Sequence, residues 1–133
     1  MIAVDTSVVV PALIEWHEQH QVALEAVADA VIPGHAYLES YSVLTRMPGG
    51  VDRHIAREVL SRRFPPERVL GLGSMTHDGI VDQSVAAEID GGSTYDALIA
   101  LIAHDNGYPL ATRDRRAART YEAVGVDVIW VGE

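Results

Sequence analysis

The sequence predicts an α/β protein with three layers, in which a central parallel sheet of about four to five strands is flanked by helices. Short runs of β-branched and other apolar residues alternate with longer segments whose apolar residues recur at helical spacing. Proline and glycine clusters separate many of these segments. Strands that alternate with helices in this way form parallel sheets through right-handed crossovers.

The predicted strands are short apolar runs, and most of them are bounded by turn-forming residues. In chain order they are residues 1–4, 31–32, 69–72, 110–112 and 126–131.

The predicted helices carry apolar residues three or four positions apart. In chain order they begin at residue 6 or 7 and end near 15, and then cover residues 17–30, 36–46, 52–63, 78–89, 93–104 and 115–124. Thr6 or Ser7 is expected to cap the first helix, and Ser93 or Thr94 the sixth. Asn106 is expected to end the sixth helix.

Composition limits the class of protein further. A chain of 133 residues with 48% hydrophobic content is expected to form one domain, residues 1–133, around one hydrophobic core. The absence of cysteine excludes disulfide scaffolds, thiolate zinc sites and cysteine nucleophiles. The start M-I-A-V-D has neither a basic region nor a long apolar run, so we expect a cytoplasmic protein that does not use a membrane.

Four acidic residues follow the predicted strands or lie near the starts of predicted helices. Asp5 follows the first strand directly and Asp114 follows the fourth, whereas Glu39 and Asp96 lie near helix starts. In an open parallel sheet these positions meet at the edge where ligands bind. Converging carboxylates would repel one another and raise their pKa values unless a cation neutralised them. Because hard oxygen ligands in this number suit Mg²⁺ or Mn²⁺, we expect divalent-metal chemistry on phosphate.

Each acid also has a structural explanation when taken alone. Asp5 would serve as a helix cap, but the two hydroxyl residues after it can supply that cap, so its carboxylate is expected to be functional. Asp96 lies in an almost wholly apolar helix, where a buried acid needs a partner or a metal, although it also complements the helix dipole. Glu39 on a solvated helix face and Asp114 as the cap of the last helix are explained as well by structure as by function. The prediction therefore depends on the set, not on any one member.

Hydroxyl and basic residues near the same edge have expected supporting roles. Thr6 and Thr112 are expected to orient carboxylates or water. Every basic residue other than histidine is arginine, and an arginine fork binds phosphate bidentately, although codon bias explains the missing lysine better than function does. Arg113, Arg115 and Arg116 are accordingly expected to contact phosphate groups of the substrate. The six histidines show no metal-ligand spacing and are given no catalytic role.

Four motifs together resemble those of PIN-domain ribonucleases, and more narrowly of the VapC toxins of VapBC toxin–antitoxin pairs. The motifs are V-D-T-S-V-V, A-Y-L-E-S-Y-S-V-L, T-Y-D-A-L-I-A-L-I-A and L-A-T-R-D-R-R-A, in that order over essentially the whole chain. The resemblance implies the three-layer PIN-like fold. The catalytic and metal-binding residues that it implies are Asp5, Glu39, Asp96 and Asp114, supported by Thr6 and Thr112.

The activity implied is that of an endoribonuclease dependent on Mg²⁺, with Mn²⁺ as an alternative, which hydrolyses phosphodiester bonds by metal-activated water. The expected substrate is a structured RNA, either tRNA or rRNA. A net charge of −9 argues against broad affinity for the RNA backbone and favours a short, shaped target. The expected protein partner is a cognate VapB-like antitoxin. The chain itself is expected to form a homodimer or to be part of a heteromeric toxin–antitoxin complex.

Other classes fit the motifs less well. A haloacid-dehalogenase-like phosphatase needs a second acid two residues after Asp5, where Ser7 stands, and it also needs a lysine. A phosphate-accepting receiver domain needs the same lysine, which this chain does not have, and a nucleotide binder would need a glycine-rich loop after the first strand. The alternative that stays open is a catalytically weak PIN-like module that binds a protein partner without cleaving RNA.

Overall fold

A five-stranded parallel sheet runs through the centre of the computed structural model, which describes residues 1–132. Its strands are β1 (Ile2–Val4), β2 (Ala30–Pro33), β3 (Val69–Leu70), β4 (Leu110–Thr112) and β5 (Val128–Trp130). Their spatial order is β3-β2-β1-β4-β5, and every neighbouring pair is parallel. The predicted parallel sheet is confirmed, although the third and fifth strands are shorter than expected.

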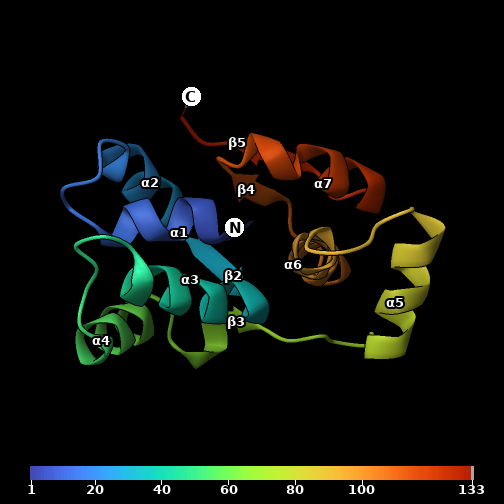
Figure 1. Ribbon diagram of the computed structural model, residues 1–133, viewed down its shortest axis with the longest axis horizontal. Coiled ribbons are helices and arrows are strands. Elements are labelled where there is room, and N and C mark those ends of the chain that lie inside the picture. The colour runs from blue at the N-terminus through green and yellow to red at the C-terminus, as the bar shows by residue number, and fades with distance from the viewer. Residues whose placement is uncertain (133) are drawn as a thin grey trace.

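Within residues 1–132 the strands are connected by seven α-helices and two short 3₁₀ turns (Figure 1). The helices are α1 (Thr6–Leu13), α2 (His20–Val27), α3 (Gly34–Arg46), α4 (Arg53–Arg63), α5 (His77–Ala86), α6 (Ser93–Asp105) and α7 (Ala118–Val124). The 3₁₀ turns are η1 (Pro66–Arg68) and η2 (Arg115–Ala117). None of the described helices is long and apolar enough to cross a membrane.

The order of the strands creates a switch point between β1 and β4. From β1 the chain moves outward through β2 to β3, and it then returns to β4 and moves outward in the opposite direction to β5. Right-handed crossovers in opposite directions are expected to cover opposite faces of the sheet. Figure 1 shows α1 to α4 on one side of the sheet and α5 to α7 on the other, which gives the predicted three layers. Ligands of open α/β sheets bind beyond the carboxyl ends of strands at such a point. Asp5 and Asp114 come directly or almost directly after the two strands that flank it.

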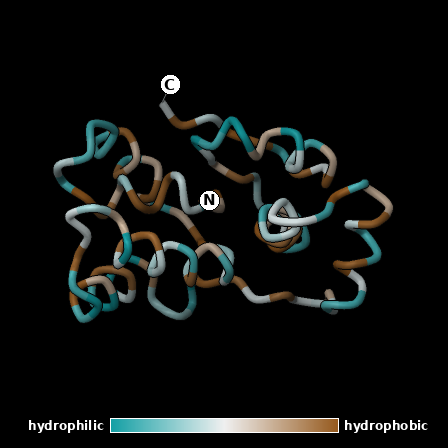
Figure 2. The backbone as a smooth tube through the Cα atoms, in the orientation of Figure 1, coloured by the Kyte–Doolittle hydropathy of each residue, from teal (hydrophilic) through white to brown (hydrophobic). Residues whose placement is uncertain are grey.

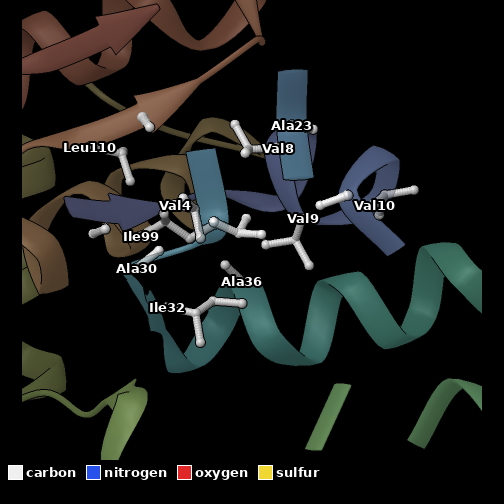
Figure 3. Packing of buried hydrophobic residues seen from close by; sticks show 14 of the residues in the cluster. Val4, Val8, Val9, Val10, Ala23, Ala30, Ile32, Ala36, Ile99 and Leu110 are labelled. Atoms are coloured by element: carbon white, nitrogen blue, oxygen red, sulfur yellow. The ribbon is translucent and has the colours of Figure 1, made fainter. Parts of the chain in front are cut away.

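The core lies between the sheet and the helices that cover it. Figure 2 shows hydrophobic colour along the central strands and hydrophilic colour on outer turns of helices such as α4. In Figure 3, Val4 and Ile32 of the sheet lie close to Val8 and Val9 of α1 and Ala36 of α3, all of them almost completely buried. This packing holds the first turns of α1 and α3 against the sheet, and so it positions Thr6 and Glu39 at the switch-point edge.

Several helix ends differ from the sequence predictions for identifiable reasons. The helix expected over residues 17–30 is confined to α2, because Ala30 already pairs with Ile2 in the sheet. The helix expected over residues 115–124 is divided into η2 and α7. Helix α7 ends at Gly125, whose φ of 89° lies in the left-handed region that glycine adopts without strain.

The predicted caps of two helices were wrong. Asp5, not Thr6 or Ser7, is the N-cap of α1, because its backbone is extended and its side chain accepts a hydrogen bond from the Ser7 amide. Helix α6 follows Gly92 and has no side-chain cap, so neither Ser93 nor Thr94 has the expected role. The C-cap of α6 at Asn106 is confirmed.

Candidate acidic active site

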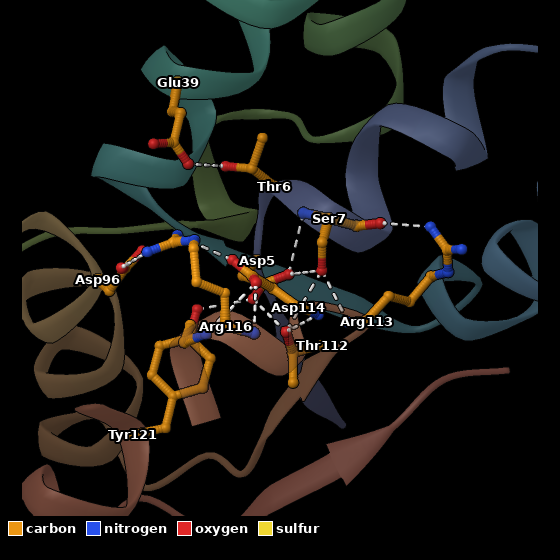
Figure 4. A network of polar contacts seen from close by, with 11 residues as sticks. Asp5, Thr6, Ser7, Glu39, Asp96, Thr112, Arg113, Asp114, Arg116 and Tyr121 are labelled. Atoms are coloured by element: carbon orange, nitrogen blue, oxygen red, sulfur yellow. Dashed lines mark hydrogen bonds and ion pairs between the residues drawn. The ribbon is translucent and has the colours of Figure 1, made fainter. Parts of the chain in front are cut away.

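The carboxylate of Asp5 is buried and accepts hydrogen bonds at both oxygens. Oδ1 accepts from the Ser7 amide at 3.0 Å and the Ser7 hydroxyl at 2.6 Å. Oδ2 accepts from the Thr112 hydroxyl at 2.5 Å and the Tyr121 hydroxyl at 2.7 Å. These donors come from α1, β4 and α7, so three elements that are distant in sequence hold one carboxylate (Figure 4).

Burial, more than repulsion between acids, determines the electrostatics of Asp5. Burial raises the pKa of its carboxyl above 3.8, the hydrogen bonds from Ser7, Thr112 and Tyr121 oppose that rise, and the nearby charge of Asp114 adds to it. The sequence prediction named mutual repulsion as the cause, which is therefore secondary for this residue. Burial and the Asp5 charge also raise the pKa of the Tyr121 hydroxyl, which stays protonated and donates.

Asp5 has a structural role that the sequence analysis judged unnecessary. The carboxylate caps α1 and also binds the Thr112 and Tyr121 hydroxyls, so it is not surplus to the fold. Tyr121 was missed altogether. The signal for it in the sequence is weak: a tyrosine on the apolar face of the last helix needs a partner for its hydroxyl, but nothing local says which one.

Asp96 and Asp114 form the outer half of the same edge and share one arginine. Asp96 lies in the first turn of α6 with 8% of its surface exposed, and Asp114 caps η2 through the amides of Arg116 and Ala117. The guanidinium of Arg116 donates from Nη1 to Asp96 Oδ2 at 3.2 Å and from Nη2 to Asp114 Oδ2 at 3.0 Å. Figure 4 shows this guanidinium between the two carboxylates.

The fourth acid, Glu39, approaches the edge from α3. Its carboxylate accepts a hydrogen bond from the Thr6 hydroxyl at the start of α1. Burial raises the pKa of the Asp96 carboxyl, Arg116 lowers it, and the charges of Asp114 and Glu39 raise it again. Glu39 is half-buried and is hydrogen-bonded to Thr6, the residue that follows Asp5, so it does not lie on a helix face turned wholly to solvent.

Two of the predicted RNA-binding arginines contact other parts of the chain. The Arg113 amide donates to the Ser7 hydroxyl at 2.7 Å, and its Nη1 donates to the Ser7 carbonyl at 3.4 Å. The guanidinium of Arg115 lies over the ring of Trp130 at 3.8 Å from its centre. Of the three, Arg116 is the one whose guanidinium lies among the acids.

The donor set suits a hard divalent cation in its chemistry, because it consists of carboxylate and hydroxyl oxygens. The raised pKa values of Asp5 and Asp96 show that protein contacts alone do not offset the burial of these acids. In the described residues, however, no three Asp, Glu or His side chains are gathered closely enough to hold an ion. The oxygens of Asp5 accept from protein donors, and Arg116 bridges Asp96 and Asp114.

Comparisons with known proteins agree with the fold and the motifs. The PIN domain family model matches residues 2–123. Ribonuclease VapC27 of Mycobacterium tuberculosis is 43% identical over 134 residues, which covers 96% of this chain and 95% of that protein. Among solved structures, FitAcB of Neisseria gonorrhoeae superposes with a TM-score of 0.68 at 19% identity, covering 97% of this chain and 96% of the other. VapC20 of M. tuberculosis, a toxin that cleaves the sarcin–ricin loop, superposes with a TM-score of 0.66 at 20% identity, covering 95% and 96%.

Proposed function

Because this chain belongs to the PIN domain family, we propose that it is a metal-dependent endoribonuclease and the toxin of a toxin–antitoxin pair. The observation that carries the proposal is that Asp5 and Asp114 follow the two strands at the switch point, with Glu39 and Asp96 linked to that edge through Thr6 and Arg116. Similarity to VapC27, named as a ribonuclease, over nearly the whole of both chains supports the activity. Similarity to the toxin VapC20 supports the biological class.

The four acids are the residues that would hold Mg²⁺ or Mn²⁺. When bound, such an ion supplies Lewis-acid activation at the scissile phosphate and offsets the charge that develops there. Asp5 is the best-organised of the four, since protein donors orient both of its oxygens. Thr6 orients Glu39 in the same way through its hydroxyl. These residues would bind RNA phosphate only with a cation present, because four carboxylates repel it.

The proposed substrate is a structured RNA, such as a tRNA or rRNA loop. Proteins that bind nucleic acid through its backbone carry an excess of basic residues, whereas this chain has a net charge of −9. Affinity must therefore come from the shape of an unpaired loop and a few local contacts. The proposed protein partner is a VapB-like antitoxin, in a heteromeric complex or together with a homodimer of this chain.

The test is cleavage of total cellular RNA by the purified, partner-free protein in Mg²⁺, Mn²⁺ or EDTA. We expect discrete fragments with either ion and none in EDTA. Asp5→Asn should reduce cleavage by at least about 10²-fold, because it removes a charge from the reacting site while keeping an oxygen that caps α1. Far-ultraviolet circular dichroism would show that the variant is folded.

Asp127→Asn is the matched control. Asp127 is exposed and precedes β5 at the opposite edge of the sheet, so the same change of charge there should leave cleavage unaltered. Full activity of Asp5→Asn would contradict the assignment of the site. Intact RNA in every condition, from a folded protein that binds an antitoxin tightly, would favour the alternative of a catalytically weak binding module.

A further inference from the structure

Arg116 binds two of the four acids with opposite arms of one guanidinium. Nη1 pairs with Asp96 Oδ2 at 3.2 Å and Nη2 with Asp114 Oδ2 at 3.0 Å. The two carboxylates come from α6 and from the residue that caps η2, which lie 18 residues apart in the sequence. A planar fork with two donors is suited to joining two carboxylates in this way.

The Arg116 side chain is held by charge and not by packing. It is 68% exposed, whereas the side chains of Asp96 and Asp114 are 12% and 28% exposed. The neighbouring arginines have other contacts: Arg113 with the Ser7 carbonyl, and Arg115 with the Trp130 ring. Within residues 1–132, Arg116 is thus the cation that forms ion pairs at the acidic edge. Because its side chain is mostly exposed, it can change rotamer without disturbing packed neighbours.

We propose that Arg116 is the resident counter-ion of the acidic edge, and that a divalent cation must displace it from Asp96 and Asp114 to bind there. This inference rests on the proposed function, because it concerns the same four acids. One oxygen of each of these two carboxylates is directed to the guanidinium. Arg116 and the ion then compete for the same oxygens.

Competition has opposite consequences in the two forms of the protein. Without a divalent ion, Arg116 stabilises the fold by offsetting repulsion among Asp5, Asp96 and Asp114. With the ion bound, the guanidinium is released but remains tethered to η2 beside the site, where its fork is free to bind an RNA phosphate. Removal of Arg116 should therefore destabilise the metal-free protein and tighten metal binding.

The decisive experiment is calorimetric titration of Mn²⁺ into the full-length, RNA-free protein and its Arg116→Gln variant. We expect the variant to bind Mn²⁺ roughly five- to thirtyfold more tightly, since two partly exposed ion pairs no longer oppose binding. Its melting temperature in EDTA should be lower than that of the wild type, and saturating Mn²⁺ should close the gap. Arg115→Gln is the matched control: it removes the same charge from the same turn, but its guanidinium contacts Trp130, so the affinity should change little.

A measurement on the unaltered protein guards against a poorly folded variant. In ¹⁵N-labelled wild type, the arginine side-chain resonance assigned to Arg116 should shift on addition of Mg²⁺, while that of Arg115 stays in place. The inference would be overturned if Arg116→Gln bound Mn²⁺ no more tightly than the wild type, or if the Arg116 resonance did not shift with Mg²⁺. Either result would leave the nuclease proposal unaffected. Failure of wild type and variant alike to bind Mn²⁺ would overturn both.

Discussion

The acidic edge has an inner half, Asp5, and an outer half, Asp96 and Asp114, and their carboxylates are stabilised by different kinds of partner. Asp5 is 3% exposed and is held by three side chains and one amide, none of which carries a charge. Asp96 and Asp114 share one charged side chain that is mostly in solvent, and Asp114 also accepts from the amides of Arg116 and Ala117. Neutral, buried donors give a carboxylate whose position is set by the fold. A solvent-exposed arginine leaves two carboxylates whose partner another cation can replace.

This difference separates the residue that anchors the site from those that adapt to a ligand. The hydrogen bonds to Asp5 also link the end of β1 to β4 and α7, so we expect substitution of Asp5 to destabilise the fold. The partners of Asp96 and Asp114 contribute less to stability, because exposed ion pairs are worth about 0–1 kcal/mol each.

The largest expected difference is in stability after truncation of each half. Asp5→Ala removes the cap of α1 and leaves the Ser7, Thr112 and Tyr121 hydroxyls without their acceptor. We expect the free energy of unfolding to fall by about 2–4 kcal/mol. Asp114→Ala removes the short cap of η2 and one exposed ion pair, so it should cost less, about 1–2 kcal/mol. Urea denaturation in EDTA measures both, and equal losses would remove the distinction between the two halves.

The second expected effect is a dependence of stability on pH that belongs to the inner half. Burial raises the folded-state pKa of Asp5 above 3.8, so the folded protein retains this proton at pH values where the unfolded chain has lost it. Its contribution to stability is complete below pH 3.8 and is lost as the pH rises through the raised folded value. The slope is at most about 1.4 kcal/mol per pH unit.

The difference in unfolding free energy between wild type and Asp5→Asn isolates this contribution, because the histidines and Asp96 are common to both. In EDTA we expect the wild type to lose stability relative to Asp5→Asn as the pH increases from about 4. A difference that is flat, or that moves in favour of the wild type, would show that burial does not control this carboxyl.

The smallest expected effect comes from the single hydroxyl that the sequence did not reveal. Tyr121→Phe keeps the packed ring and removes one donor to Asp5, so the free energy of unfolding should fall by about 1 kcal/mol. The pKa of Asp5 should rise further, because one hydrogen bond that lowers it is lost. Tyr41→Phe, on the partly exposed face of α3, is the control and should change neither quantity. An unchanged pH profile for Tyr121→Phe would mean that Tyr121 only fills space.

Much of the architecture could be predicted from local sequence. Alternation of apolar strands with amphipathic segments specified a parallel three-layer fold, because each segment must bury one face. Local sequence also placed Asp5 and Asp114 after strands, and Glu39 and Asp96 in early helical turns. In a parallel α/β sheet all of these points lie at the carboxyl edge. The motifs added the PIN family, which the comparisons confirm.

Only the tertiary structure decided how those acids are neutralised. The Tyr121 hydroxyl reaches Asp5 across 116 residues and Thr112 reaches it across 107, and no local pattern encodes such distances. The three neighbouring arginines look equivalent in T-R-D-R-R, yet their guanidinium groups have a carbonyl, an aromatic ring and two carboxylates as partners. The residue types at the edge are a property of the sequence. The partner that each one meets depends on the packing of β4, η2 and α7 against β1 and α6, because hydrogen bonds and ion pairs form only between groups that the fold brings within about 3 Å.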